Sequence, residues 1–252
     1  MIAYGLRECG AAKHRRLPLP GGSYGKAEWM ENGRDPKESP TVFLIEQPPN
    51  STIPKHFHRC NQFQLFVAGG GKIGGHEIRP LMIHYAGAFT GYGPLIAGPD
   101  GLSYFTIRSI HEEGAHILPE AASQLLKGPR RGGQAEFVLS EASSRMSLAR
   151  TTTEQILPPD RDGMSVWRAR LPSEEAFVVR VSPGLAGVFV FVVTGGAVHA
   201  GQMLSTLEHI FVSAPASNIE IKAGSDGADI LVLEMPPTAP AFTEASGRQP
   251  HG

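Results

Sequence analysis

A pattern that occurs twice, half a chain apart, constrains the fold of this sequence most. The segment FQLFVAGGGKIGGHEI begins at Phe63, and the segment VFVFVVTGGAVHAGQM begins at Val188. In both, an apolar run leads into a Gly-Gly turn, a second short run and another glycine. Placing Gly69 on Gly195 gives an offset of 126 in a chain of 252 residues. Such self-similarity predicts two copies of one structural unit.

Short apolar runs between turn residues predict that these units are made of β-strands. The chain contains 30 glycines and 21 prolines, which separate runs of β-branched and aromatic residues. The best helix candidate is His116–Lys127, with Pro119 in its first turn. The predicted fold is therefore all-β, with two tandem barrels and a short helical connection. The predicted strands are Thr41–Gln47, Phe63–Ala68, Met82–Ala86 and Leu102–Arg108 in the first half, and Ala176–Val181, Val188–Val193, His209–Val212, Ile219–Ile221 and Asp229–Leu233 in the second.

Composition shifts along the chain predict four segments. Residues 1–40 are polar and rich in glycine and proline, and we interpret them as an N-terminal arm. The stretch KGPRRGGQ, Lys127–Gln134, is predicted to be the boundary between the barrels. The first barrel is then expected over residues 41–127, the second over 128–240, and a flexible tail over 241–252.

Charge and hydropathy exclude several classes of protein. The formal net charge is -1, whereas a nucleic-acid binder needs an excess of clustered Lys and Arg. No apolar run approaches the roughly 20 residues needed to cross a bilayer, and the N-terminus lacks the apolar core of a signal peptide. Two cysteines, Cys9 and Cys60, do not make a disulfide framework, so reduced thiols and a cytoplasmic location are expected.

The segment NSTIPKHFHRCNQFQLFVAG carries the clearest chemical signal. His56 and His58 are two residues apart, so on a strand both side chains point to the same face. Two neighbouring imidazoles can chelate a divalent ion. Gln62 follows, and Gln64 shares its face if the next strand is regular.

This segment resembles the first motif of the cupin superfamily, G(x)5HxH(x)3–4E(x)6G. Asn50 stands at the first glycine, His56 and His58 at the histidines, Gln62 at the glutamate and Gly69 at the last glycine. Asparagine tolerates the left-handed backbone that glycine adopts at a turn. Glutamine in place of glutamate replaces an anionic ligand by a neutral amide, which weakens the grip on a cation.

The second cupin motif, G(x)5PxG(x)2H(x)3N, matches poorly. Aligning Met82–Pro94 to it puts Gly87 at the proline, Phe89 at the glycine and Tyr92 at the metal-binding histidine. Three alternatives follow for the missing ligand. Tyr92 lies at the metal or near it, which its position favours, or His84 has replaced the histidine, or only two strong ligands remain.

The resemblance implies a divalent metal ion, Fe, Ni, Mn or Zn with iron slightly favoured, held by His56, His58 and Gln62. It also implies that Tyr92 donates, accepts or orients a proton, and that the pocket lies inside the first barrel. Pocket-lining candidates that would contact the substrate are Gln64, Tyr104 and Arg108, although an arginine at a strand end is usually solvated. In the second barrel Ser182, Gly184 and Val188 stand at the ligand positions, so that barrel is expected to be degenerate.

The leading functional hypothesis is a metal-dependent cupin enzyme that acts on a small organic molecule, with dioxygenase-like oxidation favoured. One alternative is a non-catalytic cupin that binds a small ligand or serves a structural role, since the glutamate and a histidine are lost. Another is a metal-free or metal-assisted isomerase or lyase, in which His56 or His84 faces Tyr92. No nucleic-acid or membrane partner is expected, and we predict a homodimer or a monomeric bicupin that mimics one.

Overall fold

The computed structural model describes residues 1–19, 22–31, 39–112, 114–216 and 218–246. The chain divides into two compact units. The N-terminal residues belong to the unit that the second half of the chain forms, and the C-terminal residues belong to the unit that the first half forms. The first unit comprises Ala12–Ala135 with Pro237–Gly252, and the second comprises Glu136–Pro236 with Met1–Ala11. Both are built almost entirely of antiparallel strands, so the predicted all-β fold is confirmed.

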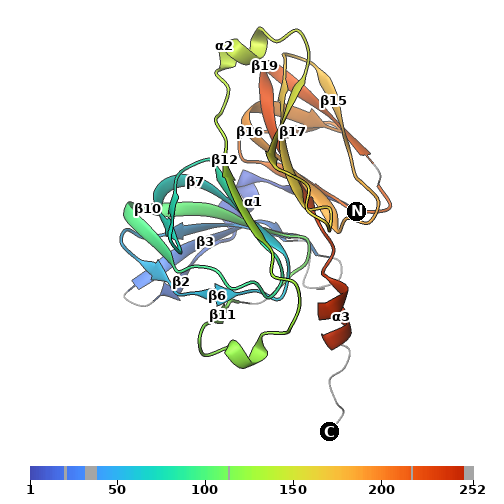
Figure 1. The fold of residues 1–252 in the computed structure, drawn as a ribbon. Coiled ribbons are helices and arrows are strands. Elements are labelled where there is room, and N and C mark those ends of the chain that lie inside the picture. The colour runs from blue at the N-terminus through green and yellow to red at the C-terminus, as the bar shows by residue number, and fades with distance from the viewer. Residues whose placement is uncertain (20–21, 32–38, 113, 217, 247–252) are drawn as a thin grey trace. The chain divides into compact units, whose positions relative to one another are not determined.

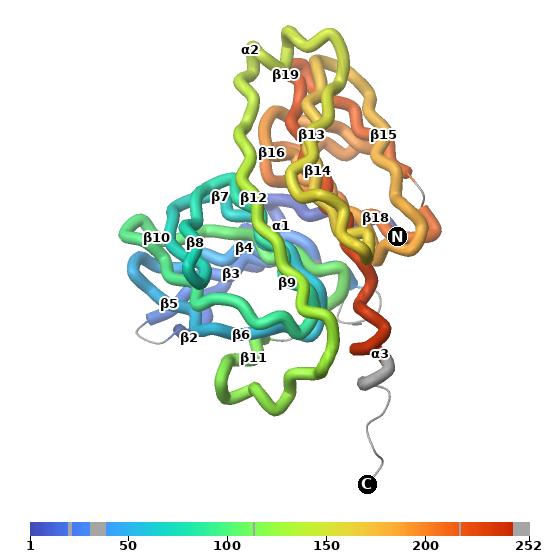
Figure 2. Tube along the Cα trace, viewed as in Figure 1, coloured from blue at the N-terminus to red at the C-terminus, as the bar shows by residue number. Residues whose placement is uncertain are grey.

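The first unit is built on a nine-stranded sheet, whose main path runs β12-β9-β7-β10-β4-β3-β2, with β5 paired to β10 and β8 to β7. A separate two-stranded sheet joins β6 and β11, which lie beside each other in Figure 2. The strands are β2 (His14–Leu19), β3 (Gly22–Glu31), β4 (Thr41–Gln47), β5 (Thr52–Ile53), β6 (His56–Phe57), β7 (Gln62–Ile73), β8 (His76–Ile78), β9 (Met82–Ala86), β10 (Leu95–Arg108), β11 (His116–Ile117) and β12 (Gly132–Glu136).

The second unit has an eight-stranded sheet with the path β1-β18-β16-β19-β14-β13, in which β15 also pairs with β19 and β17 with β16. Figure 1 shows its long strands β16 and β19 side by side, as the long strands β7 and β10 are in the first unit. Its elements are β1 (Ile2–Gly5), α1 (Arg7–Ala12), α2 (Ala142–Met146), β13 (Thr152–Leu157), β14 (Ser165–Leu171), β15 (Ala176–Arg180), β16 (Gly187–His199), β17 (Gln202–Leu204), β18 (His209–Val212) and β19 (Asn218–Met235).

The sequence repeat is also a structural repeat. Gly69 and Gly195 both have a positive φ, and in each case an added Cβ would lie 2.1 Å from the carbonyl oxygen of a glycine on the paired strand, Gly101 or Gly227. These two partners are separated by the same offset of 126 residues. In both units the register shifts at this place, which is a β-bulge where the long strands bend.

We therefore expect Gly69→Ala to destabilise the first unit by about 2–4 kcal/mol, because a left-handed backbone and a backbone oxygen both oppose a methyl group there. Gly75→Ala is the control, since nothing lies within 4 Å of its added Cβ. Urea denaturation of the two variants measures the difference. Equal stabilities would mean that the bulge is not a required feature of the fold.

The interiors of the two units differ at equivalent positions. In the first unit Gln64 pairs with Thr106 across β7 and β10, and in the second Val190 pairs with Val232 across β16 and β19, at the same offset. Val190 and Val232 belong to a core of buried aliphatic side chains. Aliphatic packing thus fills the second unit where polar side chains stand in the first, which is consistent with a degenerate second barrel.

The described residues of the expected arm, 1–19, 22–31 and 39–40, contain the strands β1, β2 and β3, which pair with strands of the two sheets. β1 pairs with β18, and β2 and β3 extend the sheet beyond β4. Trp29 and Met30 are buried, with the Trp29 ring 5.0 Å from that of Phe105. Residues 20–21 and 32–38 of the expected arm lie outside the described residues.

The helix expected over His116–Lys127 is wrong. β11 covers His116–Ile117, and only a short 3-10 helix, η1 (Ala122–Gln124), follows. The extended conformation prevails because β11 pairs with β6 and because Leu118, Leu125 and Leu126 pack on the cluster of Phe57, Phe89 and Phe242.

The expected flexible tail begins as a helix, α3 (Pro240–Ser246). Its Phe242 is buried, 4.8 Å from Phe89 between ring centroids. Residues 247–252 lie outside the described part. Of the helices that are described, none is long and apolar enough to pass through a membrane.

Candidate active site

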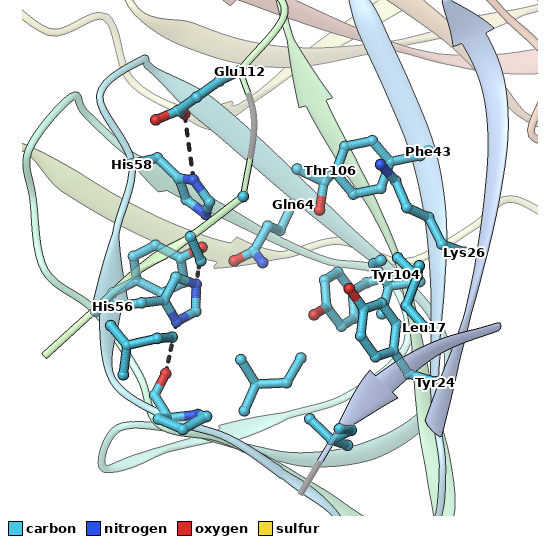
Figure 3. A pocket seen from close by; sticks show the side chains of 18 of the residues that line it. Leu17, Tyr24, Lys26, Phe43, His56, His58, Gln64, Tyr104, Thr106 and Glu112 are labelled. Carbon is cyan, nitrogen blue, oxygen red and sulfur yellow. Dashed lines mark hydrogen bonds and ion pairs between the residues drawn. The ribbon is translucent and has the colours of Figure 1, made fainter. Parts of the chain in front are cut away.

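A cavity of about 590 Å³ lies inside the first unit and is large enough for a small organic molecule. Figure 3 shows His56, His58 and Glu112 on one side of it and Tyr24, Lys26, Phe43 and Tyr104 on the opposite side, with Gln64 between them. One wall therefore carries imidazoles and a carboxylate, and the other is mainly aromatic.

Strand alternation places the two histidines. His56 and His58 line the cavity with their ring centroids 5.2 Å apart, whereas Phe57 between them packs away from it against Phe89 and His116. Backbone hydrogen bonds in both directions between His56 and Tyr92 fix the tyrosine opposite the first histidine. The prediction that both rings project into the barrel agrees with this geometry.

His56 and Tyr92 form a buried hydrogen-bonded pair. The Nδ1–H of His56 donates to the Pro54 carbonyl at 2.7 Å, which leaves Nε2 to accept from the Tyr92 hydroxyl at 2.9 Å. Burial lowers the pKa of His56, and burial raises the pKa of Tyr92. At neutral pH His56 is therefore a neutral base and Tyr92 keeps its proton.

Arg108 lies at the end of β10, and its side chain is only 4% exposed. Its Nε and Nη2 both donate to the Gln62 carbonyl oxygen, at 3.1 and 2.9 Å, and its Nη1 donates to the Glu112 backbone oxygen at 3.3 Å. Gln62 in turn donates its amide N–H to the Tyr92 hydroxyl. Arg108 thus fixes Tyr92 through Gln62.

Glu112 joins this network from the segment after β10. Its Oε2 lies 3.3 Å from His58 Nδ1 and accepts from the Cys60 thiol at 3.0 Å. Burial alone would raise the pKa of Glu112, but the hydrogen bond from His58 and the charge of Arg108 outweigh it and lower the pKa to about 2. Because a carboxylate only accepts, His58 carries its proton on Nδ1. Arg108 Nη2 lies against this ring, 3.0 Å from Nδ1 and 3.2 Å from Nε2, and Nε2 is the nitrogen that can accept from it.

The remaining predicted residues occupy different places. Gln64 and Tyr104 line the cavity, and Gln64 Oε1 lies 3.0 Å from His84 Nδ1. His84 is close to Tyr92, 5.1 Å between ring centroids, but Tyr92 is the side chain that contacts His56. Gln62 is buried behind the cavity wall rather than on it.

A divalent ion would find its predicted ligand atoms already engaged. His56 Nε2 accepts from Tyr92, Arg108 Nη2 lies within 3.2 Å of both ring nitrogens of His58, and the Gln62 oxygen accepts twice from Arg108. Within the described ranges, no three His, Cys, Asp or Glu side chains converge to hold an ion. The two imidazoles suit a metal, but the neutral amide, the protonated phenol and the adjacent guanidinium do not.

Sequence reasoning missed Glu112, Lys26 and Thr106. Thr106 has the same strand parity as Tyr104 and Arg108, so alternation could have identified it. Lys26 lay in the segment interpreted as an arm. Glu112 had no local signal, because only the three-dimensional fold brings it to His58.

Buried neutral histidines predict acid sensitivity between pH 6.5 and 4.5. Burial lowers the pKa of His58 to about 3 and that of His84 to about 4. The unfolded chain binds protons in this window and the folded chain does not, so stability is lost as the pH falls, by about 1.4 kcal/mol per pH unit for each histidine. Urea unfolding across this window should show a smaller slope for His84→Gln than for the wild type. An unchanged slope would show that His84 is protonated in the folded protein.

Two units with equivalent long strands, the first enclosing a cavity and the second with an aliphatic core at the equivalent positions, have the architecture of a two-barrel cupin fold. Comparisons with solved structures agree. The chain is similar to the bacterial pirin YhhW of Escherichia coli in complex with nickel(II), with 19% identity over 94% of this chain and 100% of that one, and a TM-score of 0.56.

It is also similar to the oxalate decarboxylase of Lactobacillus farciminis in a formate complex, with 11% identity over 96% of this chain and 90% of that one, and a TM-score of 0.59. These likenesses show the fold, and the cupin resemblance of the sequence is confirmed at that level. Neither models of protein families nor curated proteins give a match.

Proposed function

We propose that the first unit is an acid–base site that moves a proton on a small carbonyl compound, as a cupin isomerase or lyase does. The observation that carries this proposal is the 2.9 Å contact between His56 Nε2 and the Tyr92 hydroxyl at the edge of the cavity. A neutral imidazole beside a protonated phenol supplies a base and an acid together.

In this reaction the Tyr92 hydroxyl first turns its proton from His56 Nε2 to the substrate carbonyl oxygen, which frees Nε2 to accept the proton of a C–H bond next to the carbonyl. Tyr92 gives its hydroxyl proton to the carbonyl oxygen, and the substrate becomes an enol. Transfer of the proton from His56 to the Tyr92 oxygen restores both residues, so the protons balance. The Gln62 N–H that points at the Tyr92 oxygen stabilises the transient phenolate.

The opposite wall selects the body of the substrate. Tyr24, Phe43 and Tyr104 offer aromatic surface, and Lys26 lies 4.0 Å above the Phe43 ring. Gln64 and Thr106 add polar groups between the two walls. We therefore expect a substrate with an apolar portion and an oxygen-bearing portion.

The test is deuterium incorporation from heavy water into a panel of small ketones, keto acids and sugars, followed by mass spectrometry. We expect at least one compound to gain deuterium with the wild-type protein and much more slowly with Tyr92→Phe. Equal rates with the two proteins, or no incorporation into any compound, would count against the proposal.

The second candidate is the metal-dependent enzyme, in which His56, His58 and Gln62 hold a divalent ion. Two observations favour it, since the similar pirin is a nickel(II) complex and His58 has the carboxylate partner that metal-binding histidines often have. The ion would supply Lewis-acid or redox chemistry, and dioxygenase-like oxidation belongs to this candidate alone. It predicts that a chelator removes activity.

A further inference from the structure

The network around Arg108 has a feature that the proposed acid–base function does not explain. A guanidinium is permanently charged, and here it lies among the atoms that would bind a metal ion. Its Nη2 is 2.9 Å from the Gln62 oxygen, and it lies 3.0 Å from His58 Nδ1 and 3.2 Å from His58 Nε2. We infer that Arg108 is the resident cation of this site and takes the place of a divalent metal between His58 and Gln62.

The hydrogen bonds of Arg108 occupy the acceptors that an ion needs. Nε and Nη2 together use both lone pairs of the Gln62 oxygen, and Nη2 also donates to His58. A metal ion can reach these atoms only if the guanidinium leaves them. The short hydrogen bonds of the guanidinium and the burial of the Arg108 side chain, which is 4% exposed, oppose a movement of this side chain out of the site.

The local charge points the same way. Glu112 is the only carboxylate among the described residues that line the cavity, and its Oε2 lies 4.0 Å from Arg108 Nη1. The charges of Arg108 and Glu112 therefore cancel, whereas a divalent ion beside Arg108 would leave two positive charges uncompensated in a buried site. Gln62, at the position of a glutamate in the cupin motif, brings no negative charge to offset them.

Arg108 also holds the surrounding side chains in fixed orientations, as a bound metal does in other proteins. It holds His58 on one side and Gln62 on the other, and Gln62 positions the Tyr92 hydroxyl. Arg108 is thus a positioning residue, and its removal should expose a latent metal site.

The experiment measures binding of Co(II) and Ni(II), by calorimetry and by the visible absorption of cobalt, with no substrate present. We compare the wild type, Arg108→Met and the double variant Gln62→Glu with Arg108→Met, after checking each fold by circular dichroism. We expect the double variant to bind about 100-fold more tightly than the wild type, because it loses a cation and acquires a carboxylate ligand. Adding His58→Ala should abolish this binding.

Wild-type binding as tight as that of the double variant, and lost in His58→Ala, would overturn the inference. So would a folded double variant that binds no better than the wild type. If the methionine variants do not fold, Gln62→Glu with Arg108→Gln makes the same comparison, since glutamine keeps an N–H donor without the charge. Deuterium exchange tests the acid–base proposal separately, so that proposal and the inference about Arg108 can fail independently.

Discussion

Arg108→Met is expected to lower the free energy of unfolding of the first unit by about 3–5 kcal/mol, the range for breaking a buried charged pair by removing one partner. The substitution removes the donors to the Gln62 oxygen, His58 Nε2 and the Glu112 backbone oxygen at once. It also leaves Glu112 with a negative charge and, among the described residues, with His58 and His116 as its remaining ion-pair partners. Methionine fills much of the same volume, so lost packing contributes little.

The measurement is urea denaturation followed by fluorescence at pH 7. The matched control is Arg16→Met, because Arg16 is exposed and its guanidinium donates to the hydroxyl and the backbone oxygen of Ser23 on the paired strand. Its effect should stay within about 0.5 kcal/mol. If the two substitutions cost the same, the buried network around Arg108 does not stabilise the first unit.

Tyr92→Phe is expected to slow deuterium exchange by about 10²- to 10⁴-fold, the usual contribution of a positioned acid or base. The ring remains, but the proton donor to the substrate and to His56 is lost. The stability cost is smaller, about 1–3 kcal/mol, because His56 Nε2 and the Gln62 N–H each lose a buried partner.

Tyr4→Phe is the control for this prediction, since Tyr4 lies on β1 in the second unit and outside the cavity. We expect its exchange rate to match that of the wild type. A full rate in Tyr92→Phe would remove the phenol from the mechanism, whereas a lost rate in both variants would point to a general effect on folding.

Local patterns predicted the strands with clear boundaries. Thr41–Gln47, Met82–Ala86 and His209–Val212 have the same bounds in the structure as in the sequence analysis. Each is an apolar run that ends where the chain changes direction. Only Leu102–Arg108 of β10 was predicted, and β19 was predicted in two pieces, because Gly-Pro-Asp-Gly and Gly-Ser-Asp-Gly interrupt the apolar pattern while the backbone pairing continues on both sides.

The motif spacing predicted more of the site than its residue identities did. Asn50 and Phe89, which stand at motif glycines, have φ values of 57° and 58°, in the left-handed region that glycine adopts most easily. Phe89 adopts it although it is not glycine, while its ring packs against Phe57 and Phe242. The alignment that placed Tyr92 at the histidine of the second motif therefore agrees with the backbone.

The Arg108 network could not be predicted, because it depends on contacts between distant segments. The register of β7 with β10 brings Arg108 beside Gln62, and the loop after β10 returns Glu112 to His58. No local pattern distinguishes this buried arginine from a solvated one at a strand end. The lining residues of β3 were missed for a related reason, since pairing with β4 carries a polar segment into the barrel wall.

The most direct test of the account is the exchange rate of protein freed of metal. Wild-type protein is treated with a chelator, its metal content is measured by mass spectrometry, and deuterium incorporation is compared before and after treatment. Proton transfer between His56, Tyr92 and the substrate predicts the same rate in both preparations. A rate that disappears with the metal and returns when Ni(II) or Fe(II) is added would contradict it.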